Sequence, residues 1–412
     1  MGITAQEQAN RQANENMGDI DMQAGTSTQN AQVAKSLNLG QYDIAIIGLG
    51  VAGSNLARLL APHLKVIALD KKAQGGECFD SEFHKPCGGL LSEGAQAAFA
   101  RQGLTLPNAV LSHPQIFAIN TIDYGFPHAS YIQKGYVNME RHRFDLWLKS
   151  LIPSHIEVRH RAWFKRIWRE EGGDYGVEFR QEGVSYALRA RLVIGADGAK
   201  SHLRRYLYPR LSTKSLVCIQ EWFSECNAPM LSCVFDSELT PSYSWSMSKE
   251  GYFIFGGAYP HRECQRRFDT QLARLKELGF SFGKPLKREA CLVLQPHRWR
   301  DFVRGHSGVF LIGEAAGFIN ASTLEGISGA MSSAQILSRV LNACDTRSLR
   351  DKRCVKRLHA AYVRATRPLV LKTLLRHYVR YPFMFLKPLR RAILRFGVLR
   401  KRRGMEDGRV VF

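Results

Sequence analysis

Three glycines near the start of the chain have the spacing of a dinucleotide-binding turn. Gly48, Gly50 and Gly53 follow the apolar segment 44–47 and precede a helical pattern. Gly48 permits a tight turn, Gly50 lets the backbone approach a pyrophosphate, and Gly53 allows the helix to pack closely on the strand. The unpaired N–H groups at the start of such a helix bind phosphate oxygens. The pattern therefore predicts a dinucleotide site, and taken alone it fits FAD and NAD equally well.

An acid follows at the distance that such a site requires. Residues 65–69 have the apolar pattern of a second buried strand, which ends at Asp70, about 20 residues beyond the middle glycine. A carboxylate at this point accepts hydrogen bonds from ribose hydroxyls. We therefore predict that Asp70 and the adjacent Lys71 contact the cofactor.

Two later segments repeat the pattern of a buried strand followed by a bend. In residues 193–198 the bend carries Asp197 and Gly198, and in residues 311–317 it carries Glu314. Both segments resemble motifs of the flavoprotein hydroxylase superfamily, in which the first motif touches the flavin and reductant regions and the acid of the second holds the ribityl chain. Glu314 stands where that superfamily usually has Asp. The resemblance implies that the cofactor is FAD and that folding gathers the three bends into one cradle.

Within this superfamily the closest likeness is to the geranylgeranyl reductase family. Residues 85–91 match its Lys-Pro-Cys-Gly-Gly signature near the flavin, and residues 243–247 are similar to its Tyr-x-Trp-x-Phe substrate-cavity motif. Residues 141–145 match its Arg-x-x-Phe-Asp helix start, which places Arg141 toward the cofactor. Over roughly residues 41–345 the chain also resembles the enterobacterial branch of the family that is associated with colicin M tolerance.

The resemblance implies which residues contact the flavin. The expected cofactor contacts are Gly48, Gly50, Val51, Ala52, Gly53, Asp70, Lys71, Cys87, Gly88, Gly89, Arg141, Asp197, Gly198, Gly313, Glu314, Gly317, Gly326 and Ile327. Gly326 and Ile327 begin a predicted helix, whose N-terminus would stabilise negative charge on the reduced ring. The sequence contains no second glycine motif of the kind that binds a nicotinamide dinucleotide stably. We therefore expect NAD(P)H, or another reductant, to reach the flavin transiently.

The candidate catalytic residues are Cys87, Tyr243 and Trp245. Reduction of a carbon–carbon double bond needs a hydride from flavin at one carbon and a proton at the other, and the Cys87 thiol or a water is the candidate proton donor. A thiol is reactive only in an electropositive neighbourhood, so the alternative that Cys87 merely fits a tight loop stays open. Tyr243 and Trp245 alternate on one face of a strand. There they either line a cavity for a prenyl chain or pack in the core.

The elements that must position these residues belong to a mixed α/β fold. We predict a Rossmann-like FAD-binding domain with an inserted antiparallel-sheet substrate domain and a helical C-terminal tail. Apolar strands, glycine turns and helical patterns assign residues 41–125, 140–210 and 301–345 to a discontinuous FAD-binding domain. Aromatic and β-branched residues assign residues 211–300 to the antiparallel sheet, with a helix near 263–278.

The two ends of the chain differ in composition from its middle. Residues 1–40 are rich in Asn and Gln and contain no aromatic residue, so we predict that they form a disordered extension. Residues 346–412 form a basic, helix-prone tail. This tail carries most of the formal net charge of +22, which requires an anionic partner.

Part of the tail has the pattern of a basic amphipathic helix. Cations lie on one face of this helix, and apolar residues share the other. The apolar residues are Phe385, Leu386, Leu389, Ile393 and Phe396. Such a helix is typical of an anchor on an anionic membrane surface. A helix packed on the protein with a solvated basic face is the alternative. No recognised nucleic-acid motif accompanies the charge, so we expect no nucleic-acid partner.

Other features narrow the class of protein. No apolar run of about 18 residues predicts a membrane span, and the start of the chain lacks a secretory signal. The nine cysteines show no metal-ligand spacing, which predicts reduced thiols and no metal. We expect a cytoplasmic protein, peripheral on the inner face of the membrane, that uses FAD to reduce double bonds of an isoprenoid or polyprenyl lipid. The alternatives are an FAD- and NAD(P)H-dependent monooxygenase of the aromatic-hydroxylase type and a non-catalytic, flavin-bound polyprenyl-lipid-binding protein.

Overall fold

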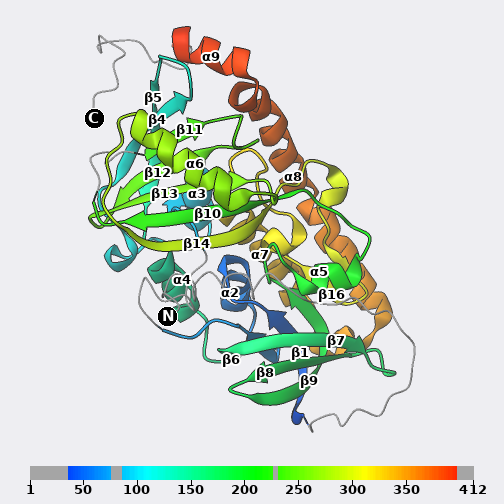
Figure 1. Cartoon of the computed structure of the whole chain (residues 1–412). Helices are drawn as coiled ribbons and strands as arrows, with labels where there is room; N and C mark the ends of the chain where they lie inside the picture. Colours follow the sequence, from blue (N-terminus) through cyan, green and yellow to red (C-terminus); the bar gives the residue numbers. More distant parts are fainter. Residues whose placement is uncertain (1–35, 76–85, 226–230, 397–412) are drawn as a thin grey trace. The chain divides into compact units, whose positions relative to one another are not determined.

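The structure, a computed structural model, describes residues 36–75, 86–225 and 231–396. Its secondary structure is built on two sheets, which Figure 1 shows with their helices. Among the described residues, secondary structure starts before the predicted boundary at residue 41, because β1 (Leu37–Ile47) already starts at Leu37. The rest of the predicted N-terminal extension, residues 1–35, lies outside the described residues.

The first sheet contains the strand that precedes the glycine turn. Besides β1, its strands are β2 (Val66–Leu69), β6 (Ile156–Arg159), β7 (Ala162–Arg169), β8 (Tyr175–Gln181), β9 (Val184–Gly195), β15 (Gly305–His306) and β16 (Val309–Leu311). The order is β15-β16-β9-β1-β2-β6, and β8 pairs with both β9 and β7. The five strands from β16 to β6 are parallel, whereas β7, β8 and β15 are antiparallel additions.

Helices cover the parallel part of this sheet. From Tyr42 onward β1 is buried, as is all of β2, which is expected of strands packed on both faces. The helix α2 (Val51–Leu59) follows β1 directly and lies against α7 (Ile327–Asn342), where Asn55 Nδ2 donates to Met331 O at 3.1 Å. The other helices of this part are α3 (Glu93–Ala100), α4 (Arg141–Ser150) and α5 (His202–Leu207). Single 3₁₀ turns are η1 (Asn108–Val110), η2 (Trp299–Asp301), η3 (Gly313–Ala316) and η4 (Thr346–Arg350).

The second sheet is mostly antiparallel. Its strands are β3 (Leu90–Leu91), β4 (Ile116–Asp123), β5 (Ser130–Asn138), β10 (Ser215–Phe223), β11 (Leu231–Phe235), β12 (Ser244–Lys249), β13 (Tyr252–Tyr259) and β14 (Pro285–Leu294). They follow the order β14-β10-β13-β12-β11-β4-β5-β3. The predicted helix in this region is α6 (Cys264–Glu277), whose buried Phe268 ring lies 5.5 Å from the ring of Phe255 on β13.

The chain enters the second sheet earlier than the sequence predicts. Residues 41–125 are assigned to the FAD-binding domain by sequence, whereas β4 and β5 extend the second sheet. β4 runs parallel to β11, with Thr121 paired to Cys233. A strand of this composition can complete its hydrogen bonds in either sheet. Which sheet it joins therefore depends on a partner strand that is distant in the sequence. Because β3 also pairs with β5, the Cys-Gly-Gly loop before Leu90 is tied to this sheet.

The long helix of the tail packs on the described body. α8 (Lys352–Phe385) buries one stripe of its surface, and within that stripe Tyr362 Oη donates to Leu311 O at the end of β16, at 3.0 Å. The opposite side of the helix is exposed. Within the described part of the chain, no helix combines the length and the apolarity needed to span a bilayer.

The last described helix, α9 (Lys387–Phe396), turns an arginine toward the body. The guanidinium of Arg390 pairs with Asp123 of β4 at 2.9 Å, and both side chains are almost completely buried. Leu394 is the other buried residue of this helix, whereas Leu386 and Phe396 of the predicted apolar face are exposed. The ion pair therefore docks α9 and leaves an apolar surface on the tail uncovered.

Candidate functional site

The structure brings the three predicted bends to one edge of the first sheet. β1, β9 and β16 are adjacent and parallel, with Ile47 paired to Gly195 and Gly195 paired to Leu311. Backbone hydrogen bonds continue this register past the strand ends, because Ala196 N donates to Ile47 O at 2.9 Å and Ile312 N donates to Gly195 O at 3.0 Å. Carboxyl ends of parallel strands meet at one edge. All three bends therefore begin there.

Gly50 and Gly53 have different surroundings in the first bend. A Cβ atom at Gly53 would lie 1.9 Å from Gly48 O, so this position admits no side chain. A Cβ atom at Gly50 would meet no described atom within 4 Å. Gly48 itself has a φ of +96°, in the left-handed region that favours glycine. The bend thus packs tightly at Gly53 and leaves room for a ligand at Gly50.

Two helices begin at this edge without a capping side chain among the described residues. α2 starts at Val51 after Gly50, and α7 starts at Ile327 after Gly326. Their first N–H groups have no partner inside the helix and form the positive ends of the helix dipoles. A pyrophosphate suits the start of α2, and an electron-rich ring suits the start of α7. The residues present at the bends therefore fit FAD.

A cavity of about 290 Å³ opens beside the glycine turn and is lined by strands of the second sheet and by the bends that follow strands of the first. The predicted site residues that line it are Gly50, Val51, Ala52, Cys87, Gly88, Gly89, Arg141, Gly198, Tyr243, Trp245, Glu314, Gly326 and Ile327. Apolar side chains such as Ile119, Met247 and Val293 complete much of the wall. The cavity thus joins the dinucleotide turn to an apolar chamber. Glu314 accepts from Leu294 N at 3.0 Å, which holds its carboxylate at the wall.

The remaining predicted residues do not line this cavity. They are Gly48, Gly53, Asp70, Lys71, Asp197, Gly313 and Gly317. Asp70 directly follows β2 and forms a buried ion pair with Lys149 Nζ at 2.5 Å, so a ribose would share the carboxylate with Lys149. Lys71 is exposed, with its Nζ 5.8 Å from the ring centre of Trp163. Asp197 accepts from the first backbone N–H of α5 at 2.7 Å, so it caps that helix.

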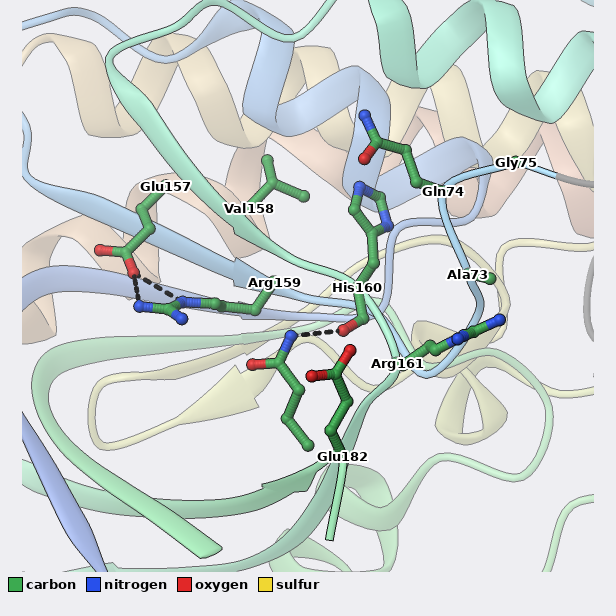
Figure 2. Close-up of a pocket in the computed structure, with 10 residues that line it drawn as sticks. Ala73, Gln74, Gly75, Glu157, Val158, Arg159, His160, Arg161 and Glu182 are labelled. Carbon is green, nitrogen blue, oxygen red and sulfur yellow. Dashed lines mark hydrogen bonds and ion pairs between the residues drawn. The ribbon is translucent and has the colours of Figure 1, made fainter. Parts of the chain in front are cut away.

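A second pocket lies at the carboxyl ends of β2 and β6 (Figure 2). It is lined by residues 73–75, 157–161 and 181–182. Glu157 pairs with Arg159 at 2.7 Å, and Gln181 Nε2 donates to His160 O at 2.8 Å. This pocket carries charges of both signs and shares no lining residue with the cavity. It is therefore a separate surface feature.

Cys87 lies in the cavity beside the ion pair of Arg141 and Asp145. Its Sγ accepts from Gly89 N at 3.4 Å, and Arg141 is also hydrogen-bonded to it. Arg141 Nε lies 2.9 Å from Asp145 Oδ1. Burial acts to raise the pKa of Asp145, but Arg141 and Lys72 outweigh it and lower that pKa. The ion pair is thus charged beside the thiol, and Arg141 and Gly89 fix the position of the sulfur.

Tyr243 and Trp245 form part of the second-sheet wall. Their ring centres lie 6.0 Å apart. Tyr243 Oη donates to Thr323 O at 2.7 Å, and burial raises the pKa of Tyr243 well above its ordinary value. Tyr243 therefore holds the segment before α7 in place and is a poor proton donor. Trp245 Nε1 is buried, and no described residue accepts its hydrogen, so a ligand can do so.

Sequence comparison relates the chain to enterobacterial proteins. No family model matches it. The protein named CbrA from Escherichia coli O9:H4 (strain HS) is 50% identical over 358 residues, which cover 87% of this chain and 94% of that protein. CbrA from Escherichia coli strain K12 is 49% identical over 358 residues, which cover 87% of this chain and 97% of that protein. The chain belongs to the CbrA family.

Solved structures share the fold of this CbrA-family chain. A geranylgeranyl bacteriochlorophyll reductase-like protein from Thermoplasma acidophilum has a TM-score of 0.65 at 19% identity, covering 82% of this chain and 87% of its own. PqsL from Pseudomonas aeruginosa, a probable FAD-dependent monooxygenase, has a TM-score of 0.60 at 17% identity, covering 87% and 99%. At these identities the likeness establishes the fold. It confirms the predicted mixed α/β architecture.

Lys249 is a site residue of this CbrA-family chain that sequence analysis missed. Its Nζ donates to Gly88 O at 2.8 Å and to Met139 O at 2.5 Å, and only 2% of the residue is exposed. The ammonium group therefore clamps the Cys-Gly-Gly loop onto the end of β12. A lysine at the end of a strand is ordinarily a surface residue, so its position in the sequence carries no signal of this role.

A polar cluster on the cavity wall was also missed. Tyr136 Oη, on β5, donates to Glu325 Oε1 at 3.2 Å, and both residues line the cavity. Cys233 of β11 lies beside them, and burial together with Glu325 raises its pKa to about 12, so it remains a neutral thiol. Glu325 directly precedes Gly326, one of the predicted flavin contacts. Only the fold brings Tyr136 and Cys233 to it.

Proposed function

We propose that this CbrA-family protein is an FAD-dependent oxidoreductase that reduces carbon–carbon double bonds of an isoprenoid or polyprenyl lipid. One observation carries the proposal: a single cavity runs from the uncapped start of α2 to a largely apolar wall that includes Met247 and Trp245. An apolar chain in this chamber would lie next to a flavin held by the three bends. The thiol of Cys87 lies in the same cavity.

The residues of the chain divide the chemistry between them. FAD, when bound and reduced, supplies a hydride for one carbon of the double bond. A proton must reach the other carbon, and Cys87 or a water beside it is the donor that we propose. Arg141 and Gly89 orient the sulfur, and the start of α7 would stabilise negative charge on a reduced flavin ring placed beside it. NAD(P)H or another donor would return the electrons.

We place this reaction at the inner face of the cytoplasmic membrane, where the protein would bind peripherally. An exposed apolar stripe supports this, because Leu371, Leu375 and Val379 recur every fourth residue along α8 and are 61%, 60% and 56% exposed. Exposed cations of the same helix flank the stripe. An apolar face bordered by Lys and Arg is the pattern of a helix that lies in the interface of an anionic bilayer.

Anaerobic turnover tests the proposed reaction. We expect purified protein whose FAD has been chemically reduced to convert a polyprenyl lipid to a product that is heavier by about 2 Da for each double bond reduced. The measurement is mass spectrometry of the lipid, without oxygen. Hydrogen peroxide or a hydroxylated product, formed only with oxygen, would instead identify the monooxygenase that the shared fold of PqsL suggests. Tight lipid binding with no product under either condition would identify a non-catalytic lipid-binding protein.

Replacing Cys87 with alanine separates the two half-reactions. We expect the variant Cys87→Ala to slow alkene reduction by about 100-fold, as expected for loss of a general acid, while flavin reduction changes by less than about threefold. Stopped-flow flavin absorbance measures both steps. The matched control is Cys291→Ala, because Cys291 also lines the cavity but lies on β14. Equal slowing of both half-reactions would remove Cys87 from the proton-donor role.

A further inference from the structure

Glu325 differs from the other charged residues that line the cavity. The Asp, Glu, Lys and Arg side chains of its described wall are Arg141, Glu314 and Glu325. Arg141 is paired with Asp145, and Glu314 accepts from a backbone N–H of β14. Glu325 accepts a hydrogen bond from Tyr136 Oη at 3.2 Å, and it forms no ion pair with any described residue. A carboxylate therefore lines the cavity without a described cation to neutralise it.

The neighbours of this carboxylate on the second sheet are neutral. Its hydrogen-bond donor Tyr136 belongs to β5, and burial together with Glu325 raises the pKa of that phenol. Burial and Glu325 likewise raise the pKa of the Cys233 thiol, on β11, to about 12. The charge of Arg380 reaches Tyr136, but this arginine is exposed, and solvent screens its field. The negative charge of Glu325 is therefore retained at the wall.

The second-sheet wall of the cavity is otherwise apolar and aromatic. Apolar side chains line it from β4, β11 and β12. The rings of Tyr243 and Trp245 also line it, with their centres 6.0 Å apart. Tyr243 Oη donates to Thr323 O, two residues before Glu325, at 2.7 Å. An anion in apolar surroundings, with aromatic rings beside it, favours a cation in the same cavity.

Reduction of an isoprenoid double bond creates such a cation on the lipid itself. The bond carries no electron-withdrawing group, so hydride addition alone would leave a full negative charge on carbon. The proton therefore adds first, and its new bond uses the electron pair of the double bond. The more substituted carbon is then electron-deficient until a hydride from reduced FAD supplies the pair for the second C–H bond. Cys87 or the water that gave the proton regains one from solvent.

We infer that Glu325 stabilises the positive charge that develops on the more substituted carbon of the isoprenoid double bond. The inference rests on the proposed function, which supplies the reaction and the lipid. Tyr136 holds the carboxylate in place before the reaction, so its field needs no rearrangement when the charge forms. The faces of Tyr243 and Trp245 add cation–π attraction. The cavity therefore binds the charged transition state more tightly than the uncharged lipid, which accelerates the reduction.

Ligand binding without turnover tests the inference. The probes are farnesol and a set of its aza analogues, each with a protonated tertiary amine in place of the more substituted alkene carbon of a different isoprene unit. Holoprotein with oxidised FAD is titrated with each probe, and flavin and tryptophan fluorescence report binding. We expect at least one analogue to bind about tenfold tighter than farnesol, because it carries the charge of the transition state. The chain has a net charge of +22, so its overall field repels these cations, and tighter binding requires a local anion.

A charge-neutral variant and a matched control locate that anion. Glu325→Gln removes the charge and keeps an oxygen that can accept from Tyr136. It should weaken the tightest analogue by about tenfold and change the affinity of farnesol by less than about twofold. The control is Glu93→Gln, because Glu93 lies between the cavity-lining residues Ser92 and Ala95, whereas its own side chain is 71% exposed and does not line the cavity. The control should change neither affinity.

The contradicting outcomes come from the same titrations. Equal affinities of farnesol and every analogue for the unchanged protein would overturn the inference. So would an undiminished preference for the analogue in Glu325→Gln, or an equal loss of preference in Glu93→Gln. Failure of farnesol and all analogues to bind would overturn the proposed isoprenoid ligand as well, whereas binding of farnesol without a preference for the cation overturns this inference alone. No reductant is present, so the result does not depend on turnover.

Discussion

Replacing Gly50 with valine is expected to leave a folded protein without flavin, whereas replacing Gly53 with valine is expected to prevent folding. A Cβ atom at Gly50 enters open space beside the start of α2, so the stability cost is at most about 1 kcal/mol. The added methyl groups would occupy the place of the pyrophosphate. We expect FAD affinity to fall by at least about 100-fold, which corresponds to about 2.7 kcal/mol.

Gly53 gives the opposite result because its neighbour is backbone. A Cβ atom there would lie 1.9 Å from Gly48 O, and no flexible side chain can move aside to relieve the overlap. Overpacking typically costs about 1–3 kcal/mol and more where, as here, backbone cannot move aside, which is a large fraction of the stability of a domain. Flavin absorbance of the purified proteins and their thermal unfolding by circular dichroism measure the two effects.

A neutral substitution completes this series. Gly135 lies in β5, where an added Cβ atom would meet no described atom within 4 Å and φ is ordinary, so Gly135→Val should retain both flavin and fold. Full FAD occupancy in Gly50→Val would contradict the assignment of the first bend to the pyrophosphate. Normal folding of Gly53→Val would contradict the close packing of α2 on β1.

The parts of the site that were predictable are those encoded by local pattern. A buried strand, a glycine bend and a helix start occupy consecutive residues at 44–53, so their spacing alone indicates both the turn and its chemistry. The bends at 195–198 and 312–317 repeat the strand-and-bend pattern, and parallel strands bring all three to one edge. For such motifs the sequence neighbours are also the spatial neighbours.

The missed residues depend on contacts between distant segments. Lys249 and Gly88 meet only because β12 and the Cys-Gly-Gly loop pack together, and neither position carries a pattern that predicts the other. The same holds for Tyr136 and Glu325. The buried pairing of Arg390 with Asp123 explains why α9 turns a cation inward, which helical periodicity cannot anticipate. Polar contacts across a fold are specified by tertiary packing and not by local spacing.

Removing the exposed apolar stripe of α8 is expected to abolish binding to membranes. We expect the triple variant Leu375→Gln, Val379→Gln, Phe383→Gln, in which Phe383 continues the stripe four residues beyond Val379, to bind vesicles of anionic phospholipid about 100-fold more weakly than the unchanged protein. The three side chains are 60%, 56% and 48% exposed, so the fold does not depend on them. Transfer of each side chain into the bilayer interface would contribute about 1 kcal/mol to the free energy of membrane binding. This is less than the value for a fully exposed side chain, because each is already about half covered by the protein. Cosedimentation with vesicles measures the loss.

The matched control removes equally exposed apolar groups from elsewhere on the protein. Trp163, Val184 and Tyr206 are 55%, 41% and 48% exposed and belong to β7, β9 and α5, so their replacement by glutamine should leave vesicle binding unchanged. Salt separates the two contributions of the tail, because screening weakens its cations and leaves apolar insertion intact. The unchanged protein should therefore retain part of its binding at high salt, and the triple variant none. Equal binding of the triple variant and the unchanged protein at high salt would mean that α8 does not insert, and the exposed stripe would then need another partner.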